Sequence, residues 1–180
     1  LPKEGDTIIL VVGDHGEGLG EHLLPSGNPH IGHIHYLNWP YLEVPFLVQS
    51  PYLKSRGKRI ATPVSIVDVG PTILGLLGWE QPGLMKGMNA LKLRKRRKDP
   101  PHIFGETYAP QAFDTSFCLI KYPWQLILTP KKSQFELYDL SQSSLESEDV
   151  YPDAMAKREI VDMRNRLNKH TRASLANKLP

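Results

Sequence analysis

The stretch TIILVVGDHGEGLGEH, residues 7–22, decides the fold. Residues 7–12 are an unbroken β-branched and aliphatic run, which is typical of a strand buried on both faces of a parallel α/β sheet. Glycines follow at once, so the chain can turn sharply at the carboxyl end of this strand, where open α/β sheets bind their ligands. The stretch therefore predicts an α/β protein with a site directly after its first strand.

The segments that follow continue the α/β pattern. Residues 23–43 carry prolines and glycines and are expected to form a long ordered loop, and residues 44–48 a second short buried strand. Residues 64–77 predict a helix, with Asp68 as its N-cap and Gly78 at its C-terminal cap. Strand, site loop, strand and helix in this order indicate a layered α/β domain.

From residue 103 the pattern changes to closely spaced strands. Residues 116–122 and 124–129 are apolar and aromatic, and residues 135–140 alternate with period two, which indicates an antiparallel sheet with one covered face. Residues 153–170 predict a surface helix with one apolar stripe that packs on this sheet. The stripe consists of Ala156, Ile160, Met163 and Leu167.

The two patterns meet at a basic run. Residues 92–98, KLRKRRK, are followed by Asp-Pro-Pro. Such a run is either a nucleic-acid or localisation patch or a solvated linker, and the prolines after it favour the linker. The sequence thus predicts a part of an α/β core over residues 1–100 and a subdomain of antiparallel strands plus a helix over residues 101–180.

The composition excludes several classes of protein. In the 180 residues, 40% are hydrophobic and 23% charged, which indicates a folded globular chain. No apolar run is long enough to predict a transmembrane helix. A single cysteine excludes an internal disulfide and a cysteine-based zinc site, and a net charge of +3 is too small to indicate nucleic acid as a partner.

Histidines concentrate just after the first strand. Five of the seven lie between His15 and His35, and neutral imidazole is both a metal ligand and a proton carrier, so the cluster marks either a site or a solvated loop. Asp14 and His15 can bind a divalent cation together if the chain turns there, which Gly13 and Gly16 permit. The alternative is a helix N-cap at Asp14 beside an incidental histidine.

Residues 9–22, ILVVGDHGEGLGEH, closely resemble the motif Asp-His-Gly-Glu-x-x-Gly-Glu-His of the sulfatase family, within the alkaline phosphatase superfamily. The similarity continues in the family's order through Gly32-His33, Val44–Val48, Pro63–Leu74 and Phe135–Leu140. It implies an alkaline-phosphatase-like α/β/α core, of which this chain is the C-terminal part. It also implies the metal-dependent hydrolysis of sulfate esters.

The resemblance assigns roles to four residues. Asp14 and His15 match the metal ligands, with Ca²⁺ as the expected ion, or Mn²⁺ or Zn²⁺ if the enzyme acts on phosphate esters. His33 matches the substrate-facing histidine, as an oxyanion contact or general acid, and its alternative is a loop histidine bonded to the backbone. His22 fits the motif as a further substrate-binding residue, with a structural role as its alternative.

Two neighbouring carboxylates and the lone cysteine are given no catalytic role. Glu17 and Glu21 are expected to hold the glycine-rich turn by hydrogen bonds. Cys118 is followed by Leu-Ile-Lys, so it does not form the family's nucleophile motif Cys/Ser-x-Pro-x-Arg. We therefore expect a missing N-terminal half of the enzyme to supply the nucleophile and the other metal ligands, and the chain alone to be inactive.

The expected substrate is a small-molecule or carbohydrate sulfate ester. The nearest alternative is a phosphodiesterase or phosphoethanolamine-type transferase of the same superfamily, because such relatives share the Asp-His pair and the Gly-His element. A second alternative is a non-catalytic metal-binding fragment.

Overall fold

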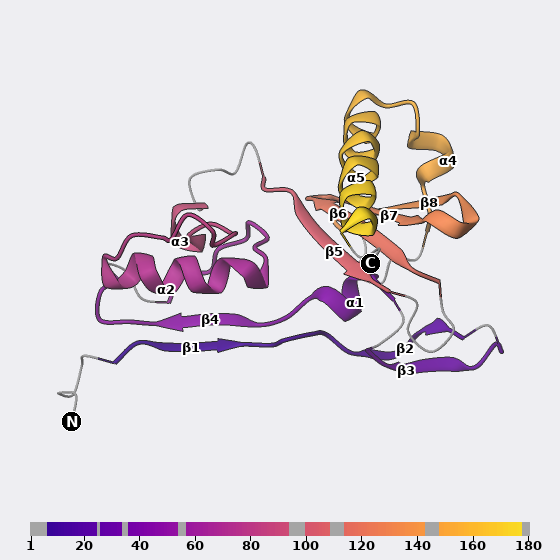
Figure 1. The fold of residues 1–180 in the computed structure, drawn as a ribbon. Helices are drawn as coiled ribbons and strands as arrows, with labels where there is room; N and C mark the ends of the chain where they lie inside the picture. The colour runs from indigo at the N-terminus through magenta and orange to yellow at the C-terminus, as the bar shows by residue number, and fades with distance from the viewer. Residues whose placement is uncertain are drawn as a thin grey trace. The chain divides into compact units, whose positions relative to one another are not determined.

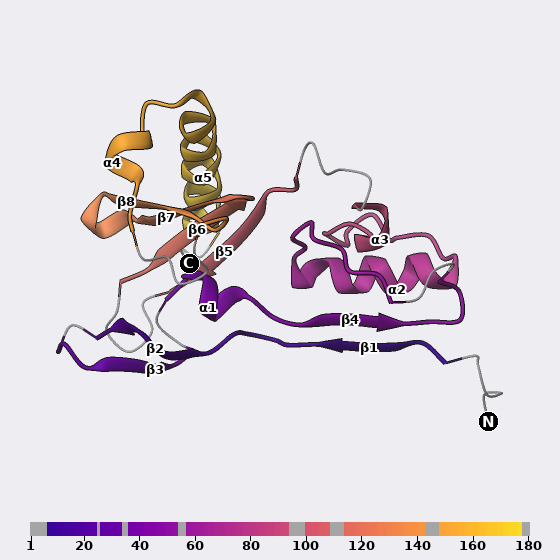
Figure 2. The same cartoon turned by 180° about the vertical axis from the view of Figure 1, so that it is seen from behind.

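The computed structural model describes residues 7–24, 26–33, 36–53, 57–93, 100–108, 114–142 and 148–177. It divides the chain into two compact units. The first unit comprises residues 1–14 and 44–101, and the second comprises residues 15–43 and 102–180. Figures 1 and 2 show their elements from opposite sides. The predicted domains, residues 1–100 and 101–180, stay a prediction.

The first unit contains the strand that the opening stretch predicts. β1 (Ile9–Val12) pairs antiparallel with β4 (Phe46–Gln49), and Val11 lies opposite Leu47. The expectation of a strand buried on both faces of a parallel sheet is wrong for this structure, because β1 is largely exposed. A β-branched run favours extended backbone wherever it lies, but its burial requires layers on both faces. Among the described residues, this sheet has only the two strands.

The helix of the first unit is close to its prediction. The predicted segment forms a 3₁₀ turn, η1 (Ile66–Asp68), followed by α2 (Val69–Leu77), and a short helix α3 (Ala90–Leu93) follows later. Gly78 ends α2 in the left-handed conformation, with φ of 73°, which a glycine adopts without steric cost. Both views show α2 and α3 on the same side of the β1–β4 ribbon (Figures 1 and 2).

Asp68 stands at the predicted N-cap position but makes different bonds. Its side chain does not cap α2. Instead, one carboxylate oxygen accepts from the backbone N–H of Ser65 at 2.9 Å, and the other accepts from that of Met88 at 2.7 Å. The buried carboxylate thus joins the start of α2 to the segment before α3.

Residues 23–43 are not the expected long loop. β2 (Gly18–Leu23) and β3 (Pro29–Gly32) form an antiparallel hairpin, and α1 (Trp39–Leu42) follows it. The prolines do not prevent this, because Pro29 is the first residue of its strand and Pro40 lies in the first helical turn.

The rest of the second unit is a four-stranded antiparallel sheet, as the strand pattern predicts. Its order follows the chain, β5-β6-β7-β8. β5 is an additional strand that the sequence pattern does not define. The strands are β5 (Ile103–Thr107), β6 (Ser116–Lys121), β7 (Trp124–Thr129) and β8 (Gln134–Asp139).

The C-terminal helical segment is divided in two. α4 (Tyr151–Ala154) precedes the long helix α5 (Arg158–Ala176), which lies against the sheet in both views (Figures 1 and 2). Ala156 falls between the helices and is exposed, so the predicted stripe is wrong at that position, and Ala154 is buried instead. The predicted packing on the sheet is confirmed. The buried core that the sheet and α5 share includes Phe117, Leu119, Leu126, Leu137, Ile160, Met163 and Leu167.

Two further sequence-based expectations concern the basic run and membrane-spanning helices. Most of the basic run, residues 94–98, lies outside the described residues. Within the described ranges, no helix is both long and apolar enough to cross a membrane.

Candidate functional site

The candidate site lies at the open end of the β2–β3 hairpin, where the segment before β2 meets the residue after β3. Gly16 and Glu17 run alongside α1, donating their backbone N–H groups to the carbonyls of Tyr41 (2.9 Å) and Pro40 (3.0 Å). These two bonds fix the backbone between His15 and β2. The site side chains therefore extend from an anchored segment.

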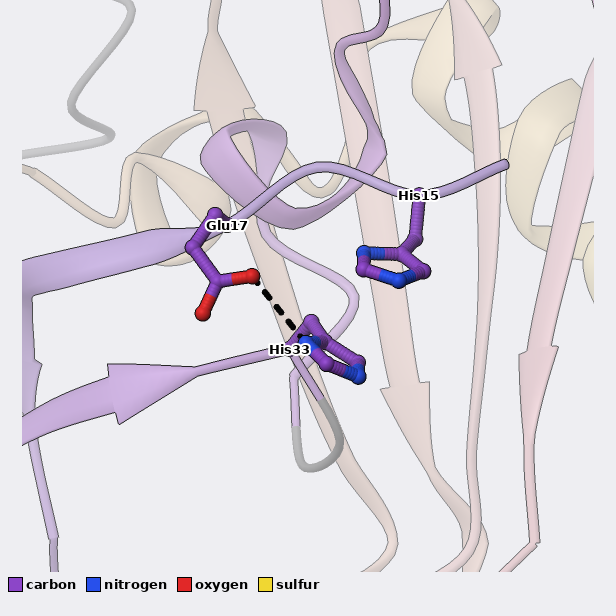
Figure 3. Close-up of side chains that lie close together, drawn as sticks. All are labelled: His15, Glu17 and His33. Atoms are coloured by element: carbon purple, nitrogen blue, oxygen red, sulfur yellow. Dashed lines mark hydrogen bonds and ion pairs between the residues drawn. The ribbon is translucent and has the colours of Figure 1, made fainter. Parts of the chain in front are cut away.

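His33 and Glu17 form the central contact of the site. Gly18 pairs with Gly32 in the hairpin, so the residues flanking this pair, Glu17 and His33, face each other across the strands. His33 Nδ1 lies 3.0 Å from Glu17 Oε2 (Figure 3). Because a carboxylate only accepts, Nδ1 carries the proton, and Nε2 is left as the second functional nitrogen. The alternative of a loop histidine bonded only to backbone does not describe His33.

His15 completes a cluster of three. Its ring stacks on that of His33, with 3.8 Å between ring centroids and 20° between planes. Its own Nδ1 lies 2.8 Å from the carbonyl oxygen of Gly16, so this nitrogen carries the proton and Nε2 carries the lone pair. Ligand atoms of His15, Glu17 and His33 all lie within 4.8 Å of one another, and all three residues are exposed (Figure 3).

The structure brings His15 and His33 together, but Asp14 belongs to the other compact unit. Asp14 is exposed and directly precedes His15 in the chain, yet it belongs to the first unit, whereas the cluster belongs to the second. The predicted pairing of Asp14 and His15 on one ion stays a prediction.

His22 lies apart from this cluster. It is partly buried on β2, and its ring is 5.6 Å from those of both Tyr36 and Tyr41. Burial lowers the pKa of His22, nearby His30 acts in the same direction, and Glu21 opposes them, so the neutral imidazole is favoured. His30 is itself buried, with its Nδ1 2.9 Å from the hydroxyl of Tyr41. The substrate-binding role of His22 stays a prediction, and His35 lies outside the described residues.

Glu17 is the site residue that sequence reasoning missed. Of the two carboxylates assigned to the glycine-rich turn, Glu21 does hold it, accepting from the backbone N–H of Leu19 at 2.6 Å. A bond from its own backbone N–H, followed by the bond from Leu19, lowers the pKa of Glu21. Glu17 instead binds His33, so its assignment to the turn is wrong. Recognising the hairpin would have revealed this pairing, because its register places the two residues opposite each other.

Comparison with known proteins identifies structures with a similar fold and a family model that matches part of the chain. The structure of BT4656 in complex with its substrate D-glucosamine-2-N,6-O-disulfate matches 97% of this chain and 36% of its own chain, with a TM-score of 0.74 at 18% identity. The fold is thus that of an alkaline-phosphatase-like α/β protein. Residues 1–79 match the family model named Sulfatase. Over these residues the chain is thus similar to the sulfatase family.

Sequence relatives include two kinds of enzyme. Arylsulfatase K of Danio rerio is 29% identical over 133 residues, which are 67% of this chain and 23% of the relative. The 2,3-bisphosphoglycerate-independent phosphoglycerate mutase of Cellvibrio japonicus is 34% identical over 91 residues, 51% of this chain and 16% of the relative. The chain therefore spans about a quarter or less of the length of these two curated relatives.

Proposed function

We propose that this chain forms part of a metal-dependent sulfuric ester hydrolase and supplies it with metal ligands and a substrate-contacting histidine. The supporting observation is the position of the His15–Glu17–His33 cluster. It lies within the residues that match the sulfatase model, directly after the predicted site strand. The proposal assigns no nucleophile to these 180 residues.

In the proposal, Asp14 and His15 hold a divalent ion, which we take to be Ca²⁺ because of the family. The donor chemistry at His15 fits a ligand role. Its Nδ1 proton is directed to the carbonyl of Gly16, which leaves Nε2 as the basic nitrogen, and Asp14 offers an exposed carboxylate. When bound, such an ion neutralises negative charge on the oxygens of the ester group.

His33 supplies the proton chemistry in this proposal. Glu17 fixes the ring through Nδ1–H, so Nε2 is the atom presented to substrate. In the imidazolium form, Nε2–H donates to a non-bridging oxygen of the ester group or gives its proton to the leaving oxygen as the S–O bond breaks. The adjacent carboxylate stabilises the imidazolium and keeps the ring orientation. His22 is retained as a proposed additional substrate contact.

The proposed substrate is a small-molecule or carbohydrate sulfate ester. Two relatives favour this class: the aryl sulfatase and the structure whose bound substrate is a sulfated glucosamine. A phosphate-directed reaction is the second candidate, because the match to the phosphoglycerate mutase covers half of this chain at 34% identity.

The test measures 4-nitrophenol release from 4-nitrophenyl sulfate and 4-nitrophenyl phosphate by the complete gene product, with calcium and after chelation. We expect preferential, calcium-dependent hydrolysis of the sulfate. His33→Asn should lower kcat by about 10²- to 10⁴-fold, which is typical for loss of a general acid. Glu21→Gln is the matched control and should leave kcat unchanged. Preferential hydrolysis of the phosphate would favour the second candidate. Hydrolysis of neither compound would exclude aryl esters, and absence of sulfate release from a sulfated glucosamine as well would contradict the proposed sulfatase activity.

A further inference from the structure

The fold assembles a second set of possible metal ligands that differs from the Asp14–His15 pair. His15, Glu17 and His33 offer two imidazole nitrogens and one carboxylate oxygen, with the ligand atoms within 4.8 Å of one another. All three belong to the second unit, which has its own buried core. Because of this, the cluster does not depend on the position of Asp14.

The types of donor atom in the cluster indicate which metal ion it can bind. Calcium and magnesium bind almost entirely through oxygen, and calcium takes about six to eight oxygen ligands. Imidazole nitrogen suits zinc, cobalt and nickel, and two nitrogens with one carboxylate are a common three-ligand set for zinc. The cluster is therefore poorly matched to calcium and well matched to an ion of the zinc type.

The distances are also compatible with one small ion. Two ligands of a tetrahedral zinc ion lie roughly 3.3 Å apart, given zinc–ligand bonds of about 2.0–2.2 Å. His33 Nδ1 and Glu17 Oε2 are 3.0 Å apart, near this value. Bringing in His15 requires a small movement of an exposed side chain, and binding releases the proton that His33 Nδ1 carries.

We infer that His15, Glu17 and His33 form a binding site for a zinc-type transition-metal ion, with water completing its coordination. The inference does not rest on the proposed hydrolysis. It does have a consequence for it, because His15 belongs to both ligand sets. Zinc at this cluster would compete with calcium for His15 and would replace the proton on His33 Nδ1 that binds Glu17 in the proposed hydrolysis.

The experiment titrates the untagged 180-residue chain with Zn²⁺ and, separately, with Ca²⁺ by isothermal calorimetry. We expect one zinc ion per chain. His33→Gln and Glu17→Gln should each weaken zinc binding at least about tenfold. Glu21→Gln, which changes a nearby exposed carboxylate outside the cluster, should bind zinc like the wild type, as should Asp14→Asn. Circular dichroism would show that each variant keeps the wild-type fold.

Three results would overturn the inference: no zinc binding by the wild type, equal binding by all variants, or a loss in Asp14→Asn as large as that in His33→Gln. The third result would place the ion on the Asp14–His15 pair. NMR of the histidine ring protons tests the wild type without substitutions. Zinc should shift the signals of His15 and His33 first, and earlier shifts at His30 or His170 would overturn the inference. Neither measurement requires turnover, so a chain without sulfatase activity still gives a result.

Discussion

At the residue scale, the candidate site depends on two glycines that let the chain pass close to α1. A Cβ on Gly16 would overlap the carbonyl of Pro40, and a Cβ on Gly18 would overlap the ring of Tyr41. Tyr41 cannot easily move away, because it is buried and its hydroxyl contacts His30. The absence of side chains at these two positions is thus what allows the segment carrying His15 and Glu17 to lie against the helix.

Gly18→Ala should therefore destabilise the second unit. The added methyl group would push the hairpin away from Tyr41, and overpacking of this kind costs about 1–3 kcal/mol in the free energy of unfolding. Urea denaturation followed by circular dichroism measures this change. Gly83→Ala is the control, because a Cβ at Gly83 meets no atom within 4 Å. Equal stability of the two variants would contradict the close packing of the hairpin against α1.

At the element scale, Glu106 connects strand β5 to helix α5. Its carboxylate accepts from His170 Nε2 at 2.6 Å, from the hydroxyl of Ser174 at 2.9 Å and from the hydroxyl of Tyr108. Partial burial disfavours the charged carboxylate, but these hydrogen bonds together outweigh it and lower the pKa of Glu106. The first strand of the sheet is thereby bound to the last turns of α5.

Glu106→Gln should remove a pH-dependent contribution to stability. Since the pKa is lower in the folded chain than its ordinary value of 4.5, the contribution is fully present above that value and is lost as the pH falls through the folded pKa. We expect the variant to be less stable by about 1 kcal/mol near neutral pH, a modest value for a partly exposed group. Thermal unfolding across acidic and neutral pH measures the difference.

The control for this prediction is Asp162→Asn. Asp162 pairs with Arg166 at 2.7 Å on the same helix, but both side chains are about half exposed, so its loss should not change stability measurably. A Glu106→Gln difference that stays constant as the pH falls through the acid range would contradict the proposed role of the charge.

The elements also show what the sequence could predict. β1 and α2 depend on local patterns, a β-branched run and an apolar face that ends at Gly78, and both lie close to their predicted positions. The hairpin is not predictable in this way, because Pro25 and Pro29 are typical of loops. Without its register, nothing indicated that Glu17 contacts His33, sixteen residues away along the chain. Motif similarity therefore points to His15 and His33 but does not predict the contact between Glu17 and His33.

At the scale of the whole molecule, the β1–β4 ribbon presents apolar side chains to solvent. Val11 and Leu47 lie opposite each other and are 51% and 61% exposed. Among the described residues, β1 and β4 pair only with each other, so each has one unpaired edge. Unpaired strand edges with exposed apolar side chains favour association with other chains.

The 180-residue chain should therefore self-associate through this ribbon. Leu47→Lys places a charge in the middle of the exposed face, opposes edge-to-edge pairing and should shift the chain toward monomer at the same concentration. Size-exclusion chromatography with light scattering measures the shift. Leu84→Lys is the control, since Leu84 is 94% exposed in the same unit but lies outside the ribbon. If both substitutions increase the monomer fraction equally, the effect comes from net charge alone and the ribbon is not the associating surface.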